Sequence, residues 1–321
     1  MSQHFKYGQS QTLPCRYLGS NISLVDGDIR VNQDHYVAAL EIPDITGIQS
    51  LKRDEILPDE FQTIFRSITS KLNMLAMTSR PDIMVDVKVL TTKYGGATKR
   101  DLITAIKNTK KIKEQSTELT LPNIGKIEEW ILVGVTDASN KSVNKIFAVG
   151  GFVIMLVNKH TNRASVLSWS SKKIDRVCNS SLAAETLSLQ MLASNMFFVR
   201  QILEQMFGDR AANIPGLALT DNQDLYSCVH NLKACEDKRL LADIISIKQA
   251  IADDKTITEL RYISKDVMIS DCLTKTGKLG EDLLNIVRTG VYHIPGGVKI
   301  RDSTKLNIKT WQQLMKAECE I

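Results

Sequence analysis

The 321-residue sequence has no CxxC pair among its six cysteines, no metal-like spacing among its five histidines and no long apolar run. These absences argue against zinc-ribbon, thioredoxin-type and histidine-zinc sites. The longest apolar stretch, residues 146–157, is too short to cross a bilayer, so we expect no membrane partner. The start is polar and carries no secretory signal. We therefore expect an intracellular protein with free or buried cysteines.

The composition is that of a soluble folded protein. Hydrophobic residues make up 43% of the chain, enough for one large domain or two ordinary ones. Charged residues make up 24% and aromatics 6%, which is not a disordered composition. The net charge of +5 is compatible with a phosphate-backbone partner but does not demand one.

The first section of the chain predicts a hairpin followed by helices. Residues 17–24 and 29–31 flank Asp26-Gly27, a dipeptide typical of tight turns. From Pro58 onward, apolar residues recur every three or four positions, which predicts an amphipathic helix. The segment 79–82, SRPD, interrupts this pattern because proline cannot continue a helix.

A lysine-rich helix is expected to close this section, capped by Thr98 and ending near Lys113. The run of lysines at 107, 110, 111 and 113 favours a solvated face over a nucleic-acid contact. Residues 114–128 are polar and contain Pro122 and Gly125, so we expect a linker there.

After residue 128 the pattern changes to alternating strands and helices. Three strands joined by short turns precede a long helix, and two further strands alternate with helices, which predicts an α/β domain with an antiparallel and a parallel half. The expected strands are 130–135, 147–157, 165–169, 217–220 and 258–263, and the expected helices are 180–206, 222–230, 238–252 and 269–273.

Four acidic residues occupy strand ends and helix starts in this section: Asp137, Glu185, Asp221 and Asp271. In sheet-based α/β domains such positions converge on one rim. Carboxylates are hard oxygen ligands that suit Mg²⁺ or Mn²⁺, and two such ions can serve the attacking water and the leaving oxygen of a phosphodiester. Each residue alone is equally well explained as a turn former, a cap or a residue favoured by the helix dipole.

Residues 130–277 resemble the ribonuclease H domain of copia-type LTR retrotransposons. Six segments in family order carry the resemblance: TDAS (136–139), SWSSKKI (168–174), SSLAAE (180–185), DNQ (221–223), KRLLADI (238–244) and SDCLTK (270–275).

The resemblance implies a ribonuclease H-like fold, a mixed five-stranded sheet with flanking helices, in which Asp137, Glu185, Asp221 and Asp271 bind two Mg²⁺ or Mn²⁺ ions. The substrate it implies is the RNA strand of an RNA–DNA hybrid. Contacts to phosphate are expected from Lys172, Lys173, Lys238 and Arg239, although solvated positions explain these four residues equally well.

The sequence departs from the family pattern at three places. Ala183 stands where the family has an acidic residue, and Ser270 stands where it has alanine. Retroviral relatives carry a histidine before the final aspartate that helps release product, and residues 262–269 contain none. The missing histidine bears on turnover more than on metal binding.

The first section resembles the thumb and connection region that follows the palm of copia-type reverse transcriptases. The matching segments are RYLG (16–19), QDHYV (33–37), FRSI (65–68) and SRPDI (79–83). The YVDD-type motif of the palm does not occur in the chain. We expect a smaller, mainly helical α+β region at 1–120, a ribonuclease H-like domain at 130–277 and a C-terminal tail at 278–321. The rest of a Pol polyprotein is the implied partner, in a cytoplasmic particle or the nucleus.

Two other functions stay open at this point. One is a noncatalytic remnant that binds nucleic acid or a partner, which the missing palm and the Ala183 and Ser270 departures favour. The other is an integrase-like transposase, which the SWSSKK and CLTK contexts disfavour because they belong to the ribonuclease H branch.

Overall fold

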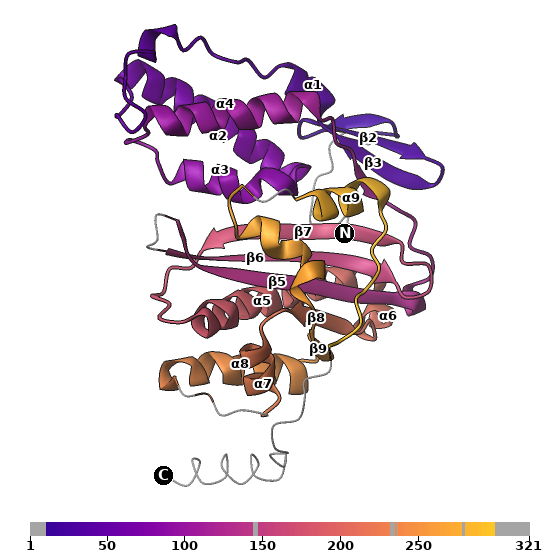
Figure 1. Cartoon of the computed structure of the whole chain (residues 1–321). Helices are drawn as coiled ribbons and strands as arrows, with labels where there is room; N and C mark the ends of the chain where they lie inside the picture. Colours follow the sequence, from indigo (N-terminus) through magenta and orange to yellow (C-terminus); the bar gives the residue numbers. More distant parts are fainter. Residues whose placement is uncertain (1–10, 144–146, 232–234, 236, 278–279, 299–321) are drawn as a thin grey trace, which may run out of the picture. The chain divides into compact units, whose positions relative to one another are not determined.

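The computed structural model describes residues 11–143, 147–231, 235, 237–277 and 280–298, coloured along the chain in Figure 1. Contacts divide the chain into two units. Unit 1 contains the residues up to Gly125, together with Arg163–Val166 and Gly280–Tyr292. Unit 2 contains Lys126–Asn162, Leu167–Leu279 and the residues from His293 on.

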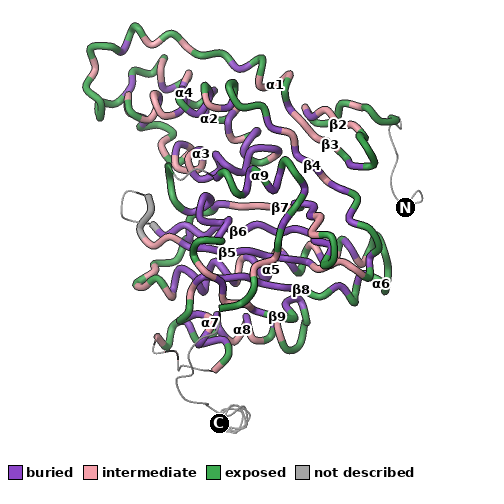
Figure 2. Tube along the Cα trace, turned by 45° about the vertical axis from the view of Figure 1, so that its right-hand side comes forward, coloured by how far each residue is buried: buried purple, intermediate pink, exposed green. Residues whose placement is uncertain are grey.

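A mixed five-stranded sheet is the centre of unit 2, with strand order β7-β6-β5-β8-β9. β5 is antiparallel to β6 and parallel to β8, and β8 is parallel to β9. The central strands are buried, as the purple stretches of Figure 2 show, which suits a sheet covered on both faces. The strands are β5 (Trp130–Val143), β6 (Phe147–Asn158), β7 (Ala164–Lys173), β8 (Gly216–Thr220) and β9 (Glu259–Tyr262).

Helices flank this sheet, and the long helix α5 lies along one face of it (Figure 1). α5 begins where the Ser180 side chain accepts a hydrogen bond from the Ala183 amide, a normal N-cap. The α-helices are α5 (Ser181–Phe207), α6 (Asp209–Ala212), α7 (Gln223–Val229) and α8 (Leu241–Ala252), and the 3-10 helices are η3 (Ile127–Glu129), η4 (Lys238–Leu240), η5 (Lys265–Val267) and η6 (Ile269–Leu273). The predicted mixed sheet with flanking helices is confirmed.

Two adjacent glycines of β6 let elements approach from opposite faces of the sheet. A Cβ added at Gly150 would lie 3.0 Å from Ser188 Oγ of α5. A Cβ added at Gly151 would lie 2.8 Å from Leu273 Cβ of η6. Because successive strand residues face opposite sides, α5 packs on one face of β6 and η6 on the other.

Unit 1 is the smaller, mainly helical α+β region that the sequence predicts. Its sheet is antiparallel with order β1-β2-β3-β4. The strands are β1 (Cys15–Tyr17), β2 (Ser20–Val25), β3 (Asp28–Asn32) and β4 (Leu119–Leu121), the α-helices are α1 (Asp34–Ala38), α2 (Asp59–Thr78), α3 (Met84–Thr91), α4 (Lys99–Glu114) and α9 (Glu281–Thr289), and the 3-10 helices are η1 (Thr46–Ile48) and η2 (Pro81–Ile83).

Two local expectations for this unit are wrong. The expected strand 17–24 is split between β1 and β2, because Leu18 and Gly19 have positive φ values of 46° and 80° and form a turn. The expected linker 114–128 contains β4, which pairs with β3. The prolines and glycines around β4 hide the short alternating stretch Leu-Thr-Leu that fits a strand.

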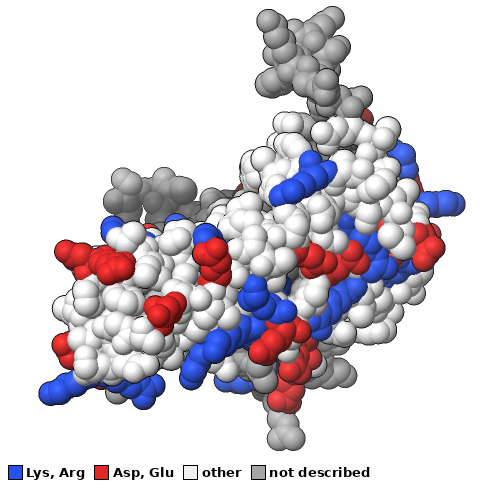
Figure 3. Space-filling view, turned by 90° about the horizontal axis from the view of Figure 1, so that it is seen from above, with Lys and Arg blue, Asp and Glu red and all other residues white. Residues whose placement is uncertain are grey.

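Most of the α4 lysines named above lie on the solvated face that the sequence favours, but Lys111 is half-buried and its Nζ lies 3.4 Å from Oδ2 of the buried Asp82. Lys107 and Lys110 are exposed, and Lys113 Nζ donates to the Leu40 carbonyl at 2.7 Å. On the face shown in Figure 3, basic side chains lie beside acidic ones, as the modest net charge suggests.

None of the helices in the described part of the chain has the length and apolar character needed to cross a membrane.

Part of the expected C-terminal tail is a folded element of unit 1. α9 buries Leu283, Leu284, Ile286 and Val287, and the Arg288 carbonyl accepts a hydrogen bond of 2.6 Å from Thr120 Oγ1 of β4. The tail therefore contributes to the core of unit 1 through α9. Residues 299–321 lie outside the described residues, and the domain boundaries at 120, 130 and 277 stay a prediction.

Candidate metal centre

Asp137 lies inside β5, opposite Gly151 of β6. The expectation that it ends its strand is wrong, because β5 continues to Val143. Its side chain is buried and accepts a hydrogen bond from the Thr274 hydroxyl at Oδ2. Ser188 of α5 donates to the Asp137 carbonyl at 2.9 Å. Both the backbone and the carboxylate of Asp137 are therefore fixed from either side of the sheet.

The carboxylates of Asp137, Asp221 and Asp271 come together. One oxygen from each lies within 4.8 Å of the others, and all three residues are buried. Asp221 directly follows β8, which is the parallel neighbour of β5, so both side chains lie toward the same edge of the sheet. Asp271 comes from η6, which packs on the Gly151 face next to Asp137.

The turn after β8 fixes the backbone beside Asp221. The Asn222 side chain caps α7 by accepting from the Leu225 amide at 2.8 Å, and the Asn222 amide donates to Thr220 Oγ1 at 3.2 Å. The capping role considered for Asp221 thus belongs to Asn222. Asp221 has a buried carboxylate that the local helix does not use.

Glu185 stands beside this cluster without belonging to the three residues within 4.8 Å. It lies in the second turn of α5 and is 4% exposed. Its Oε2 is buried and has no hydrogen-bond partner. Burial, followed by the charges of Asp137 and Asp221, raises the pKa of Glu185 to about 9. These charges act on Glu185 because its carboxyl group faces the same centre.

The pKa values of two other carboxyl groups in this centre, those of Asp137 and Asp221, are also raised. Burial is the main cause that raises the pKa of Asp137 to about 6, and the charges of Asp271 and Asp221 add to it. Burial also raises the pKa of Asp221. The Thr274 hydrogen bond and the Lys275 ammonium oppose this shift at Asp137. The centre therefore holds more negative charge than the protein compensates.

Glu185→Gln is expected to stabilise the metal-free protein at alkaline pH. The raised pKa means that folding favours protonated Glu185, so its stabilising effect is full below pH 4.5 and is lost as the pH rises toward about 9. At pH 8 the variant should be more stable by about 5 kcal/mol, and near pH 4 the difference should vanish. Urea unfolding in EDTA at both pH values measures this.

Glu204→Gln, on the same helix, is the matched control for this measurement. Glu204 lies outside the carboxylate cluster, and its side chain bonds Gln201. An equal gain in both variants would contradict the assignment of Glu185 to the charged centre.

The four predicted phosphate contacts are exposed and belong to elements other than those that supply the described carboxylate cluster. Lys172 and Lys173 are exposed and are the last residues of β7, so the expectation that they follow the strand is wrong. Lys238 and Arg239 are exposed residues of η4. Arg239 Nε contacts Asp237 Oδ1 at 3.1 Å. When the Asn179 amide is oriented with its oxygen toward Arg239, this oxygen accepts a hydrogen bond from Arg239 Nη2 at 2.8 Å.

Residues that support the centre were missed in the sequence. Thr274 and Lys275 belong to the SDCLTK segment, and their position three and four residues after Asp271 was the available signal, since one helical turn brings such residues together. Lys275 Nζ lies 2.5 Å from Asp271 Oδ1. Ser188 carries no sequence signal, because its role depends on how α5 packs against β5.

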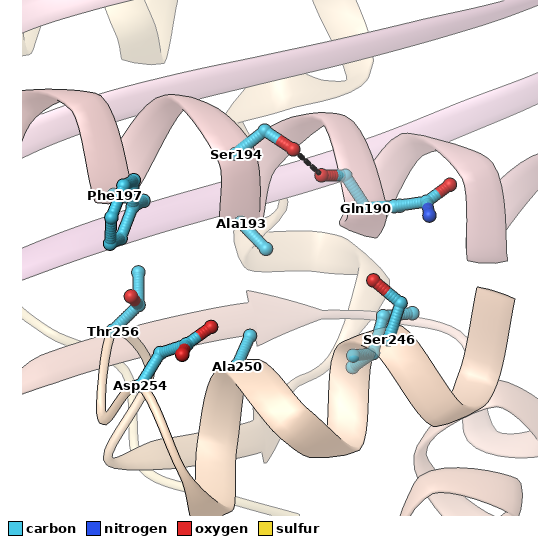
Figure 4. Close-up of a pocket in the computed structure, with 9 residues that line it drawn as sticks. Gln190, Ala193, Ser194, Phe197, Ser246, Ala250, Asp254 and Thr256 are labelled. Atoms are coloured by element: carbon cyan, nitrogen blue, oxygen red, sulfur yellow. Dashed lines mark hydrogen bonds between the residues drawn. The ribbon is translucent and has the colours of Figure 1, made fainter.

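A separate pocket of about 300 Å³ lies between α5 and α8 and shares no residue with the carboxylate cluster. Figure 4 shows Phe197, Ala193 and Gln190 on the α5 side, and Ala250 and Ser246 on α8. The Ser194 hydroxyl donates to the Gln190 carbonyl at 3.0 Å (dashed in Figure 4). The pocket therefore has a mixed lining of apolar side chains, hydroxyl groups and the Asp254 carboxylate.

No protein-family model matches the sequence, and none of the curated proteins matches it. Among solved structures, the chain is similar to LC11-RNase H1, isolated from compost by a metagenomic approach, at 14% identity over 48% of this chain and 98% of that chain, with a TM-score of 0.35. It is similar to an N-terminal RNase H domain from Mycobacterium tuberculosis at 13% identity over 49% and 94%, with a TM-score of 0.34.

A third similar structure is the foamy viral protease-reverse transcriptase in complex with RNA/DNA hybrid. The identity is 13% over 91% of this chain and 32% of that chain, with a TM-score of 0.37.

Proposed function

We propose that unit 2 is a metal-dependent ribonuclease H that hydrolyses the RNA strand of RNA–DNA hybrids. The observation that carries the proposal is the convergence of Asp137, Asp221 and Asp271, whose carboxylate oxygens lie within 4.8 Å of one another in a buried site. Three separate elements supply them. Such a concentration of like charge is unfavourable unless a cation compensates it.

The residues fit Mg²⁺ or Mn²⁺, and two ions suit the number of carboxylates. Oxygen donors alone form the centre, which is the ligand set of hard divalent cations. The buried Oε2 of Glu185 lacks a partner, and the pKa values of Asp137, Glu185 and Asp221 are all raised, first by burial. Ion binding would satisfy the orphaned oxygen and offset the crowded charge.

Asp137, Glu185, Asp221 and Asp271 would hold the ions. When bound, such ions activate water and stabilise the leaving oxygen of a phosphodiester. The chain itself supplies the positioning: Thr274 orients one oxygen of Asp137, and Ser188, 2.8 Å from Thr136 Oγ1, holds the backbone of Asp137 through its carbonyl. These bonds fix the carboxylates before substrate arrives, which is what a catalytic centre needs.

The substrate class follows from the proposed activity. A hybrid is recognised by its shape, its phosphates and its 2′-hydroxyls rather than by sequence. Exposed Lys172, Lys173 and Lys238 suit phosphate contacts, whereas Arg239 would first have to exchange its bonds to Asp237 and Asn179.

We also propose that the chain derives from a copia-type Pol polyprotein, acts inside the cell and has the rest of that polyprotein as its partner. The segments of the first section that resemble a thumb and connection region support this origin.

Incubation with end-labelled substrates tests the activity. The full chain should cut the RNA strand of an RNA–DNA hybrid in Mg²⁺ or Mn²⁺, and should leave duplex DNA and duplex RNA intact. EDTA should abolish cleavage. Metal-independent cleavage, or no cleavage of the hybrid, would overturn the proposal, and hybrid binding without cleavage would favour the noncatalytic remnant.

The departures from the family pattern do not remove a metal ligand. Ala183 is buried with Cys228, Leu240 and Ile244 in an apolar cluster, where an acidic side chain would be unfavourable. Ser270 is fully buried, and its hydroxyl contacts Met268 Sδ at 3.0 Å. Both substitutions therefore concern packing beside the centre, which favours the catalytic function over the remnant.

A further inference from the structure

Lys275 places a positive charge between two of the carboxylates. Its Nζ lies 2.5 Å from Asp271 Oδ1 and 3.7 Å from Asp137 Oδ2. The contact to Asp271 spans one helical turn, since the Lys275 amide also donates to the Asp271 carbonyl at 3.0 Å. The lysine thus folds back over its own turn to reach the carboxylate and extends across to β5.

The charge of Lys275 acts on the whole centre. It lowers the pKa of Asp137, Glu185 and Asp221, although burial outweighs it at each. The lysine itself responds in the opposite direction: burial lowers its pKa, but the hydrogen bond to Asp271 and the neighbouring carboxylates raise it overall. The ammonium therefore stays charged and compensates part of the negative charge.

The lysine is held less firmly than the carboxylates. Its side chain is 45% exposed, whereas those of Asp137 and Asp271 are 2% and 9% exposed. An ammonium at the solvent boundary can leave the centre without opening the core, because its long stem moves through water. The Thr274 hydroxyl holds Asp137 independently of the lysine, so the Asp137 carboxylate keeps this partner when the lysine leaves.

We propose that Lys275 is a displaceable counter-cation, which compensates part of the charge of Asp137 and Asp271 in the metal-free protein and is displaced when a divalent ion binds between them. The inference rests on the proposed function in that it concerns the same metal centre. A divalent ion and the ammonium compete for the same carboxylate oxygens. Metal binding is therefore weaker than the carboxylates alone would give, and the metal-free fold is more stable.

Lys275→Met removes the charge and keeps the length of the side chain. The variant should bind Mn²⁺ about tenfold more tightly than the wild type, since one partly exposed charge-assisted hydrogen bond no longer has to be broken. Its thermal midpoint in EDTA should fall by several degrees, and its gain in midpoint on adding Mn²⁺ should increase. Lys275→Arg should keep affinity at or below the wild-type value.

Loss of the free Mn²⁺ signal in electron paramagnetic resonance measures the affinity, with Mn²⁺ alone as the probe and no nucleic acid present. Lys159→Met is the matched control, because it removes the same charge from an exposed turn of unit 2, where the Lys159 ammonium donates to the Glu128 carbonyl at 3.2 Å. Unchanged or weaker binding by Lys275→Met would overturn the inference, and so would a wild-type protein that binds no Mn²⁺.

The hybrid-cleavage assay and the Mn²⁺-binding assay can give opposite results, so each tests its own proposal. Tighter Mn²⁺ binding by Lys275→Met in a protein that cuts no hybrid would support Lys275 as a counter-cation and contradict the proposed ribonuclease activity. Hybrid cleavage by a protein whose Lys275→Met variant binds Mn²⁺ like the wild type would do the reverse.

Discussion

Asp137→Asn is expected to lower the rate of hybrid cleavage by about a thousandfold or more. The substitution keeps the shape of the side chain and the hydrogen bond from Thr274 can persist. It removes the negative charge of Asp137. The charges of Asp271 and Asp221 raise the pKa of Asp137, and the charge of Asp137 in turn raises the pKa of Glu185. A single-turnover assay with labelled hybrid and saturating Mn²⁺ measures the loss.

Measuring the stability of Asp137→Asn distinguishes a folding defect from a catalytic defect. In EDTA, Asp137→Asn should be at least as stable as the wild type at pH 8, because it relieves repulsion around a carboxyl group whose pKa burial and neighbouring acids raise to about 6. Asp209→Asn is the control. Asp209 begins α6, which leads into the first residue of β8. The carboxylate cluster lies at the other end of β8, where Asp221 follows the strand. A slow Asp209→Asn or an active Asp137→Asn would contradict the proposed centre.

The sequence allowed the element order of unit 2 to be predicted because each element carries its own local signal. The long helix α5 is indicated by its Ser180 cap and ends at a glycine, and the short strands are apolar runs between turns. Extending β5 through Asp137 to Val143 was not predictable, since polar residues there give no strand pattern. They are held by pairing with β6, which depends on tertiary context.

The same division applies to the candidate site. Family context in the sequence pointed to the four acids, and the structure brings three of them together. The different state of Glu185, buried with an unpartnered oxygen, depends on the packing of α5 and could not be predicted. β4 and α9 were missed for a similar reason: they complete unit 1 from segments far away in the chain.

Two segments that carry the resemblance of the first section meet in unit 1. Ser79 Oγ donates to Gln33 Oε1 at 2.8 Å, and both residues are buried. The next residues form an ion pair in which Arg80 Nε lies 2.8 Å from Asp82 Oδ1, with side chains 2% and 1% exposed. The segments QDHYV and SRPDI therefore have a structural role that their sequence pattern alone did not indicate.

Asp82→Ala should destabilise unit 1 by about 3–5 kcal/mol, because it leaves the buried Arg80 guanidinium without its counter-charge. Arg80 would keep its hydrogen bond to the Gln115 carbonyl, at 2.8 Å, but lose both bonds to Asp82. Hydrogen exchange of α2 and α4 measures the loss. Tryptophan fluorescence reports unit 2, since Trp130 and Trp169 belong to it.

The destabilisation should depend on pH in a defined direction. Burial raises the pKa of Asp82, but the hydrogen bond and charge of Arg80, with Lys111, lower it overall. The pair therefore stabilises the wild type above pH 3.8 and loses its effect as the pH falls through the lower folded value, so the two proteins should converge in acid. Asp54→Ala, which breaks an exposed pair with Arg100, should cost less than about 1 kcal/mol. Equal losses in both variants would mean that the buried charge of Arg80 is not what Asp82 stabilises.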